Sequence, residues 1–212
     1  ISISRTADQP TSKNILTKFN TSRLRHDAIL DALIRGAAPL LNKEELVVRL
    51  RHHGRFTDRE QNTASLVGWL THHFPIAFEV QAQMSLPNFV ADVSTKLRLA
   101  PDAGAAFGWL CHSASGDNTF RPLKNNKPFD IFFSFLEDVR LGANATEQFR
   151  VLKTLVRHNY TNESFYPEPL IVHVEVHDEC IQITIKANSA LFCEDTLSNL
   201  VINILDDLAY MP

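Results

Sequence analysis

Four of the nine histidines in this chain stand in two adjacent pairs, His52–His53 and His72–His73. A neutral imidazole exchanges protons near pH 7 and binds metal ions, so these pairs are the first candidates for chemistry. We expect both pairs to lie on or beside β-strands. Adjacent side chains on a strand point to opposite faces, so only one member of each pair can join a shared site. We therefore predict no metal site and interpret the pairs as a coincidence of composition.

The three cysteines, Cys111, Cys180 and Cys193, are widely spaced and include no Cys-x-x-Cys pair. Neither a zinc site nor a thioredoxin-like motif is indicated. Cys111 is followed by His112, but neighbours in sequence make a poor nucleophile–base pair, so we expect an inert thiol. Thiols without a disulfide framework are typical of a reducing compartment, and we expect a cytoplasmic protein.

Composition narrows the class of protein further. The net charge of −3 argues against a nucleic-acid surface. No segment approaches the ~18 consecutive apolar residues of a membrane span. The 212 residues suit one large domain or two lobes, and methionine occurs only at Met84 and Met211. We interpret the chain as an excised or processed piece of a longer protein.

Periodicity in the first half predicts helices alternating with strands. Helical spacing of apolar residues occurs over 27–38 and over 86–97, the second with Ser85 as N-cap. Strand alternation occurs over 45–51 and over 76–80. We expect an edge strand and a connector over 1–20, and loops over 57–63 and most of 101–128.

The second half completes a mixed pattern. Residues 129–136 form an apolar run suited to a central strand buried on both faces, and 170–176 with 180–186 predict a hairpin. Helices are predicted over 145–157 and, with a strong apolar stripe, over 197–208. The fold class is therefore α+β, a sheet with helices packed on it.

Five segments, in this order, resemble motifs of one enzyme family. They are Asp-Ala-Ile-Leu-Asp-Ala-Leu at 27–33, Leu-Arg-His-His-Gly-Arg at 50–55, Val-Gly-Trp-Leu-Thr with Phe-Pro-Ile over 67–76, the Pro-x-x-Gly-x-x-Phe-Gly-x-Leu pattern at 101–110, and Phe-Ser-Phe-Leu-Glu at 133–137. Together they are similar to the C-terminal half of epimerization domains and, more broadly, condensation domains of nonribosomal peptide synthetases. The resemblance covers nearly all of residues 1–212.

The resemblance implies a chloramphenicol acetyltransferase-like lobe with a mixed β-sheet. In such domains two lobes form a V around a tunnel, which receives the phosphopantetheine arm of a carrier protein. The family's catalytic His-His-x-x-x-Asp-Gly motif lies on the other, N-terminal lobe. Neither histidine pair of this chain supplies that motif, because Asp58 comes one place too late after the first pair and no acid follows the second.

Measured against the family motifs, the expected reaction groups are changed. Arg51 stands where the family has its proton-transferring glutamate, while His53 and Arg55 match. Ser134 and Phe135 replace an asparagine and a tyrosine. An arginine stays protonated and cannot act as a base, so we predict no catalytic residue in this chain.

Aromatic residues offer a second set of candidates. Trp69, Phe107, Trp109 and Phe133 are candidates for lining the tunnel. For the two tryptophans the first interpretation is a place in the core, and the tunnel is the alternative. Arg51 and Arg55 are interpreted as surface charges or structural ion-pair partners, with the phosphate of the pantetheine arm as the alternative.

Three functional hypotheses remain open at this point. The first is a degenerate lobe that binds no cofactor itself and docks a carrier protein or a neighbouring synthetase domain. The second is half of an active condensation or epimerization domain, completed by an upstream lobe. The third is an unrelated α+β interaction domain. An exposed face between lobes also predicts self-association of the isolated chain.

Overall fold

The structure, a computed structural model, describes residues 1–55, 63, 65–80, 86–112, 129–137, 167–177 and 179–210. Six strands form one mixed sheet in the order β1-β6-β5-β4-β2-β3. The strands are β1 (Ser2–Thr6), β2 (Glu45–His52), β3 (His72–Glu79), β4 (Ile131–Leu136), β5 (Leu170–His177) and β6 (Cys180–Ala187). The helices are α1 (Gln9–Lys18), α2 (Ser22–Leu41), α3 (Leu86–Leu99), α4 (Phe107–His112) and α6 (Glu194–Tyr210), with a 3-10 turn η1 at Pro101–Gly104.

Strand β4 lies inside the sheet and runs parallel to both of its neighbours, β2 and β5. The carboxylate of Asp130 fixes its start, because it accepts hydrogen bonds from the backbone N–H of Val47 at 2.8 Å and from Lys43 Nζ at 2.5 Å. The backbone N–H of Asp130 donates to the Val47 carbonyl at 2.9 Å. These contacts set the register between β4 and β2 before the ladder begins.

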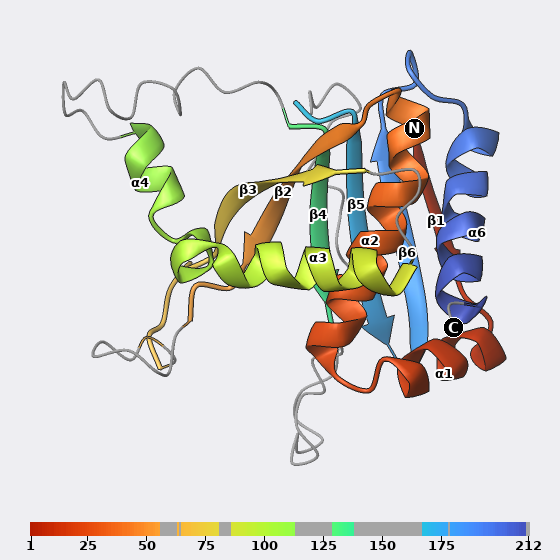
Figure 1. The fold of residues 1–212 in the computed structure, drawn as a ribbon, viewed down its shortest axis with the longest axis horizontal. Helices are drawn as coiled ribbons and strands as arrows, with labels where there is room; N and C mark the ends of the chain where they lie inside the picture. Colours follow the sequence, from red (N-terminus) through yellow and green to blue (C-terminus); the bar gives the residue numbers. More distant parts are fainter. Residues whose placement is uncertain are drawn as a thin grey trace.

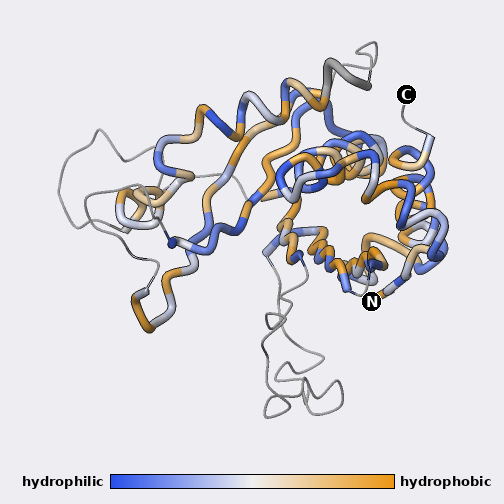
Figure 2. Tube along the Cα trace, turned by 90° about the horizontal axis from the view of Figure 1, so that it is seen from below, coloured by the Kyte–Doolittle hydropathy of each residue, from blue (hydrophilic) through white to orange (hydrophobic). Residues whose placement is uncertain are grey.

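The helices α1, α2, α3 and α6 lie on one side of the sheet (Figure 1). Apolar residues at alternate strand positions, such as Leu50, Phe133 and Val172, are almost fully buried on this side. Helix α2 lies over the middle of the sheet between α3 and α6, and its buried stretch runs from Asp27 to Ile34. Figure 2 shows that both the sheet and the helices contain hydrophobic stretches along the chain.

The strand predictions are confirmed for 45–51 and for the hairpin, where β5 and β6 pair from Leu170↔Ala187 to His177↔Cys180. Glu179, in the two-residue connection, has a φ of 61°, which such tight hairpin turns require. The predicted helices over 27–38, 86–97 and 197–208 are also present, as parts of α2, α3 and α6. The α+β class is therefore confirmed.

Residues 9–18, predicted as connector, instead form helix α1. Asp8 caps it, because its carboxylate accepts a hydrogen bond from the Thr11 backbone N–H at 2.8 Å, and Pro10 lies in the first turn, where a missing N–H costs nothing. The predicted strand at 76–80 begins earlier, at His72. The predicted helix over 145–157, the cap at Ser85 and the loop over 57–62 lie outside the described residues.

Candidate functional site

A row of polar side chains crosses the side of the sheet opposite to the helices. Strand pairing aligns His73 of β3 with Arg51 of β2, and Ser134 of β4 with His173 of β5. The parallel register of β2 and β4 runs through Leu50↔Phe133, so Arg51 and Ser134 are the next neighbours. We call His73, Arg51, Ser134 and His173 the polar row. It joins four strands that are far apart in sequence.

Burial and nearby positive charges together set the pKa values of the polar row. Burial lowers the pKa of His73, and the guanidinium groups of Arg49 and Arg51 lower it further. Burial also lowers the pKa of His173, with Lys186 and Arg51 adding to the effect against the opposing charge of Glu175. Both imidazoles are therefore neutral at pH 7, beside a cation that cannot lose its proton.

An aromatic ring supports the polar row from the neighbouring register position. Phe132 lies edge-on to His73 at 5.3 Å and to His173 at 5.8 Å between ring centroids. The guanidinium of Arg49 stacks 4.9 Å from the same ring. Arg49 is neutralised by Glu168, whose side chain is fully buried. Their closest atoms are 2.6 Å apart but are not aligned for a hydrogen bond, so the contact is an ion pair.

The first histidine pair differs from the prediction that the two members of a pair point to opposite faces of a strand. His52 and His53 do not point to opposite faces; their rings stack at 4.3 Å, because β2 ends at His52 and the chain turns at Gly54. His72 joins them, with its ring 5.2 Å from that of His52, and donates from Nε2 to the Ala103 carbonyl at 2.9 Å. His73 alone faces the polar row.

Two glycines of the matched motifs have identifiable structural roles. Gly54 has a φ of +71°, and a Cβ there would lie 1.9 Å from the Leu70 carbonyl oxygen. Gly104 has a φ of +74°, and its Cβ would lie 2.1 Å from the ring of Phe74 in β3. The Pro-x-x-Gly motif thus packs η1 closely against β3, at the end of the sheet where the histidines gather.

Arg55 fills a structural position that differs from the predicted ion pair. Its guanidinium donates to the backbone carbonyls of Thr63, Leu66 and Gly68, at 3.4, 2.5 and 3.2 Å. The side chain therefore holds the chain between β2 and β3 in place. His53 contributes to the same turn, because its Nδ1 accepts the Arg55 backbone N–H at 3.0 Å.

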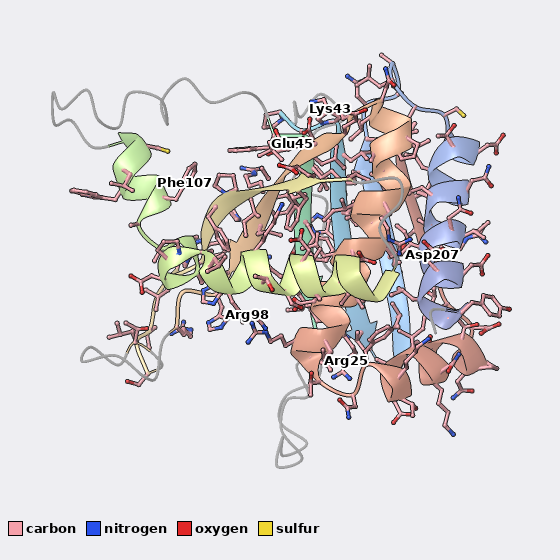
Figure 3. All side chains as sticks on the ribbon, in the orientation of Figure 1. Arg25, Lys43, Glu45, Arg98, Phe107 and Asp207 are labelled. Atoms are coloured by element: carbon pink, nitrogen blue, oxygen red, sulfur yellow. The ribbon has the colours of Figure 1, made fainter. Side chains whose placement is uncertain are left out.

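The aromatic candidates divide into exposed and buried residues. The first interpretation of the two tryptophans, a core position, is wrong, because Trp69 is 82% exposed and Trp109 is 68% exposed. Phe133 is 1% exposed and belongs to the core under α2. Phe107, labelled in Figure 3, is partly buried against that core. The four candidates therefore do not line one common surface.

Phe135 and Glu137, in the last of the five matched segments, contact α2. The Phe135 ring lies edge-on to His26 at 5.8 Å. Glu137 forms an ion pair with Arg25, labelled in Figure 3. His26 Nδ1 in turn lies 3.0 Å from the buried carboxylate of Asp27. Phe135 and Glu137 tie the end of β4 to the start of α2 and add no group to the polar row.

Sequence reasoning identified Arg51 and Ser134 but missed His73 as a member of the same row and did not consider His173 or the Arg49–Glu168 pair. No spacing in the sequence links residue 51 to residue 173, because their proximity depends on the strand order. The alternating pattern of β5 placed His173 on its polar face, which was the only available signal. The row offers hydrogen-bond donors and one fixed positive charge, and it contains no carboxylate base.

No family model matches the chain. In sequence, it is 24% identical over 201 residues to bacitracin synthase 2 of Bacillus licheniformis, covering 94% of this chain and 7% of that protein. It is 27% identical over 123 residues to one of the linear gramicidin synthase proteins of Brevibacillus parabrevis, covering 57% of this chain and 2% of that protein.

In structure, the chain is similar to the epimerization domain from the third module of tyrocidine synthetase B, with a TM-score of 0.78 at 19% identity. The match covers 99% of this chain and 47% of the solved one. The condensation domain of the Monacolin K polyketide synthase MokA gives a TM-score of 0.69 at 13% identity, over 98% of this chain and 46% of the solved one. The chain is thus a relative of nonribosomal peptide synthetases with the fold of about half of a condensation/epimerization-type domain.

Proposed function

We propose that this chain is the C-terminal lobe of a condensation/epimerization-type domain that docks a carrier protein or a neighbouring synthetase domain and performs no proton transfer itself. The observation that carries the proposal is the position of Arg51 in the polar row. The resemblance puts a glutamate base at this position, and the chain has a permanently charged arginine there.

The surroundings of Arg51 support a non-catalytic role. A base that removes the α-proton of a thioester-bound aminoacyl group must reach within hydrogen-bond distance of it. Ser134 and Phe135 replace two further polar groups of the family motif, and the Phe135 ring is turned toward His26 of α2. His73 and His173 are neutral, but each is held beside Phe132 and close to Arg51.

Continuous strands and an exposed apolar surface in the described part of the chain support the docking proposal. The strands that carry the polar row are continuous, and the turns at Gly54 and Gly104 are closely packed. Leu66, Val67 and Trp69, beyond the end of β2, expose 52%, 103% and 82% of their surfaces. We call these three residues the apolar tip. Exposed apolar groups of this size are typical of protein contact surfaces.

A titration with a carrier protein tests docking directly. We expect the chain to bind a phosphopantetheinylated carrier from a peptide synthetase, and Trp69→Ser to weaken the binding by about tenfold because aromatic anchors dominate such contacts. The unmodified carrier shows what the arm contributes. Tyr210→Ser, at the exposed end of α6, is the matched control. The absence of binding to either carrier form would contradict the docking role.

The alternative function is half of an active domain, with an upstream lobe that supplies the catalytic histidine. Condensation, as the resemblance implies it, does not require the glutamate that Arg51 replaces, so condensation is the activity that such a half could keep. Joining the chain to an N-terminal lobe with an intact His-His-x-x-x-Asp-Gly motif tests this alternative. Peptide-bond formation by the joined protein would support it, and its absence would favour the docking role.

A further inference from the structure

The positive charge of Arg51 is not balanced by a carboxylate among the residues that the structure describes. Two acidic groups on the same side of the sheet have other partners. Glu168 is paired with Arg49, and the carboxylate of Glu175 lies 3.0 Å from Nε2 of His177. Arg51 is exposed, whereas Ser134 beside it is 7% exposed. A charged head group thus stands within a partly buried polar row, between His73 and Ser134.

Arg49 provides an internal comparison on the same strand and the same face of the sheet. Its guanidinium is clamped between the buried carboxylate of Glu168 and the ring of Phe132. The charge of Arg49 is therefore neutralised within the fold. Two residues further along β2, Arg51 has neither a clamp nor a counter-ion among the described residues. Of the two arginines on this face, Arg49 is therefore neutralised by a neighbouring carboxylate and Arg51 is not neutralised by any described residue.

The neighbours of Arg51 are suited to donating hydrogen bonds. A guanidinium presents five N–H groups in a planar fork that matches an oxyanion. A neutral imidazole keeps one N–H donor, and the Ser134 hydroxyl adds another. Adjacent strands are about 4.8 Å apart, so donors from β3, β2 and β4 lie within reach of one small group placed over Arg51.

We propose that the polar row binds a single oxyanion group, a carboxylate or a phosphate, with Arg51 as its charged donor and His73 and Ser134 on the adjacent strands as neutral donors. This goes beyond docking, since no carrier protein is needed for the binding. The substitution of the family's glutamate by arginine then replaces a base by an anion receptor. An unpaired carboxylate on the ligand would be repelled by a glutamate here and is attracted by Arg51.

The test is a titration of the full chain with sodium phosphate and, separately, sodium acetate, at constant ionic strength set by chloride. Ring signals of His73 and His173 in NMR report occupancy of the row, and calorimetry gives the dissociation constant. Arg51→Gln and Arg51→Glu remove or reverse the charge. Arg98→Glu is the control, because Arg98 is an exposed arginine of α3, on the helix-covered side of the sheet (Figure 3).

We expect saturable binding that weakens by about tenfold or more in both Arg51 variants and is unchanged in Arg98→Glu. Tighter binding of phosphate would assign the site to a phosphate group, and tighter binding of acetate to a carboxylate. Circular dichroism and thermal unfolding check that each variant is folded. Binding that does not saturate, or that is equal in the parent and all variants, would overturn the proposal. Since no carrier takes part, its failure would leave the docking role untouched.

Discussion

The residue that distinguishes this chain is Arg51, because its charge affects every titratable member of the polar row. A guanidinium cannot lose its proton at ordinary pH, so its effect on its neighbours is permanent. It lowers the pKa of His73 and of His173, in addition to the effect of burial. By resemblance this position would carry a base. The arginine found there instead disfavours the protonated form of the two nearby histidines.

Arg51→Gln should raise the pKa of both histidines, because it removes a nearby positive charge from each. The pKa of His73 should stay below its ordinary value, since burial and Arg49 still act on it. NMR titration of the ring signals measures both values, with Arg98→Gln as the matched control. Unchanged pKa values in Arg51→Gln would show that the guanidinium does not act on the row.

Gly54→Ala should destabilise the fold by about 2 kcal/mol or more, because it combines a left-handed backbone with a clash. The added Cβ would lie 1.9 Å from the Leu70 carbonyl oxygen. Gly108→Ala, in α4, is the control, since a Cβ there meets nothing within 4 Å. Urea unfolding of both variants measures the difference. Equal stability of the two variants would mean that the turn after β2 is not as tightly packed as described.

At the scale of elements, helices α2 and α6 are joined by a buried carboxylate. Arg35 donates to Asp31 Oδ2 from Nε at 3.1 Å and from Nη2 at 2.9 Å, and Nη1 donates to Asp207 Oδ2 at 2.9 Å (Figure 3 labels Asp207). The other oxygen of Asp31 has no hydrogen-bond partner among the described residues. Burial outweighs the attraction of Arg35 and raises the pKa of Asp31 to about 6.

This pKa predicts a pH dependence of stability with a definite sign. Because the folded value of about 6 exceeds the ordinary 3.8, the folded state holds the proton more tightly. The stabilisation is full below pH 3.8 and is lost as the pH rises through about 6. The free energy of unfolding of the parent minus that of Asp31→Asn should therefore fall across this window, by about 3 kcal/mol at most.

Urea unfolding at several pH values measures this difference, and Asp206→Asn, at an exposed position of α6, serves as the control. The difference between the parent and Asp206→Asn should change little over the same window. A difference between the parent and Asp31→Asn that rises with pH would contradict the assignment.

The elements with strong periodicity were predictable from sequence, and the weakly patterned one was not. The strands of the hairpin and helix α6 have apolar residues at their full spacing, which burial against the sheet requires. Helix α1 buries only Ser12 and Ile15, so its sequence shows little amphipathic pattern. The sequence does contain two signals of a helix start, Asp8 as the cap residue and the proline in the first turn. The polar composition of this segment nevertheless favoured a connector.

Single residues of the candidate site were predictable from the segment in which each lies, but their arrangement across several strands was not. Arg51 and Ser134 could be identified by their places in matched motifs, but the polar row also needs the order β5-β4-β2-β3. The stacking of His52 on His53 could not be predicted either, because it depends on where β2 ends and how Gly54 turns the chain. Adjacent residues alternate between faces only while the strand continues.

At the scale of the whole molecule, the apolar tip predicts self-association. Exposed apolar surface is removed from water when two chains meet, so we expect sedimentation that depends on concentration. Trp69→Ser should shift the chain toward monomer, and Tyr210→Ser should not. Analytical ultracentrifugation of the three proteins measures the effect. A monomer at every concentration would contradict the prediction.

The central proposal is that the lobe docks a carrier protein or a neighbouring synthetase domain and transfers no proton. Its most direct test is mass spectrometry of an aminoacyl thioester on a phosphopantetheinylated carrier, incubated with the chain in heavy water. The account predicts carrier binding with no deuterium at the α-carbon above the rate without protein. Deuterium incorporation that depends on the chain would contradict it, and would mean that His73 or His173 acts as a base despite the charge of Arg51.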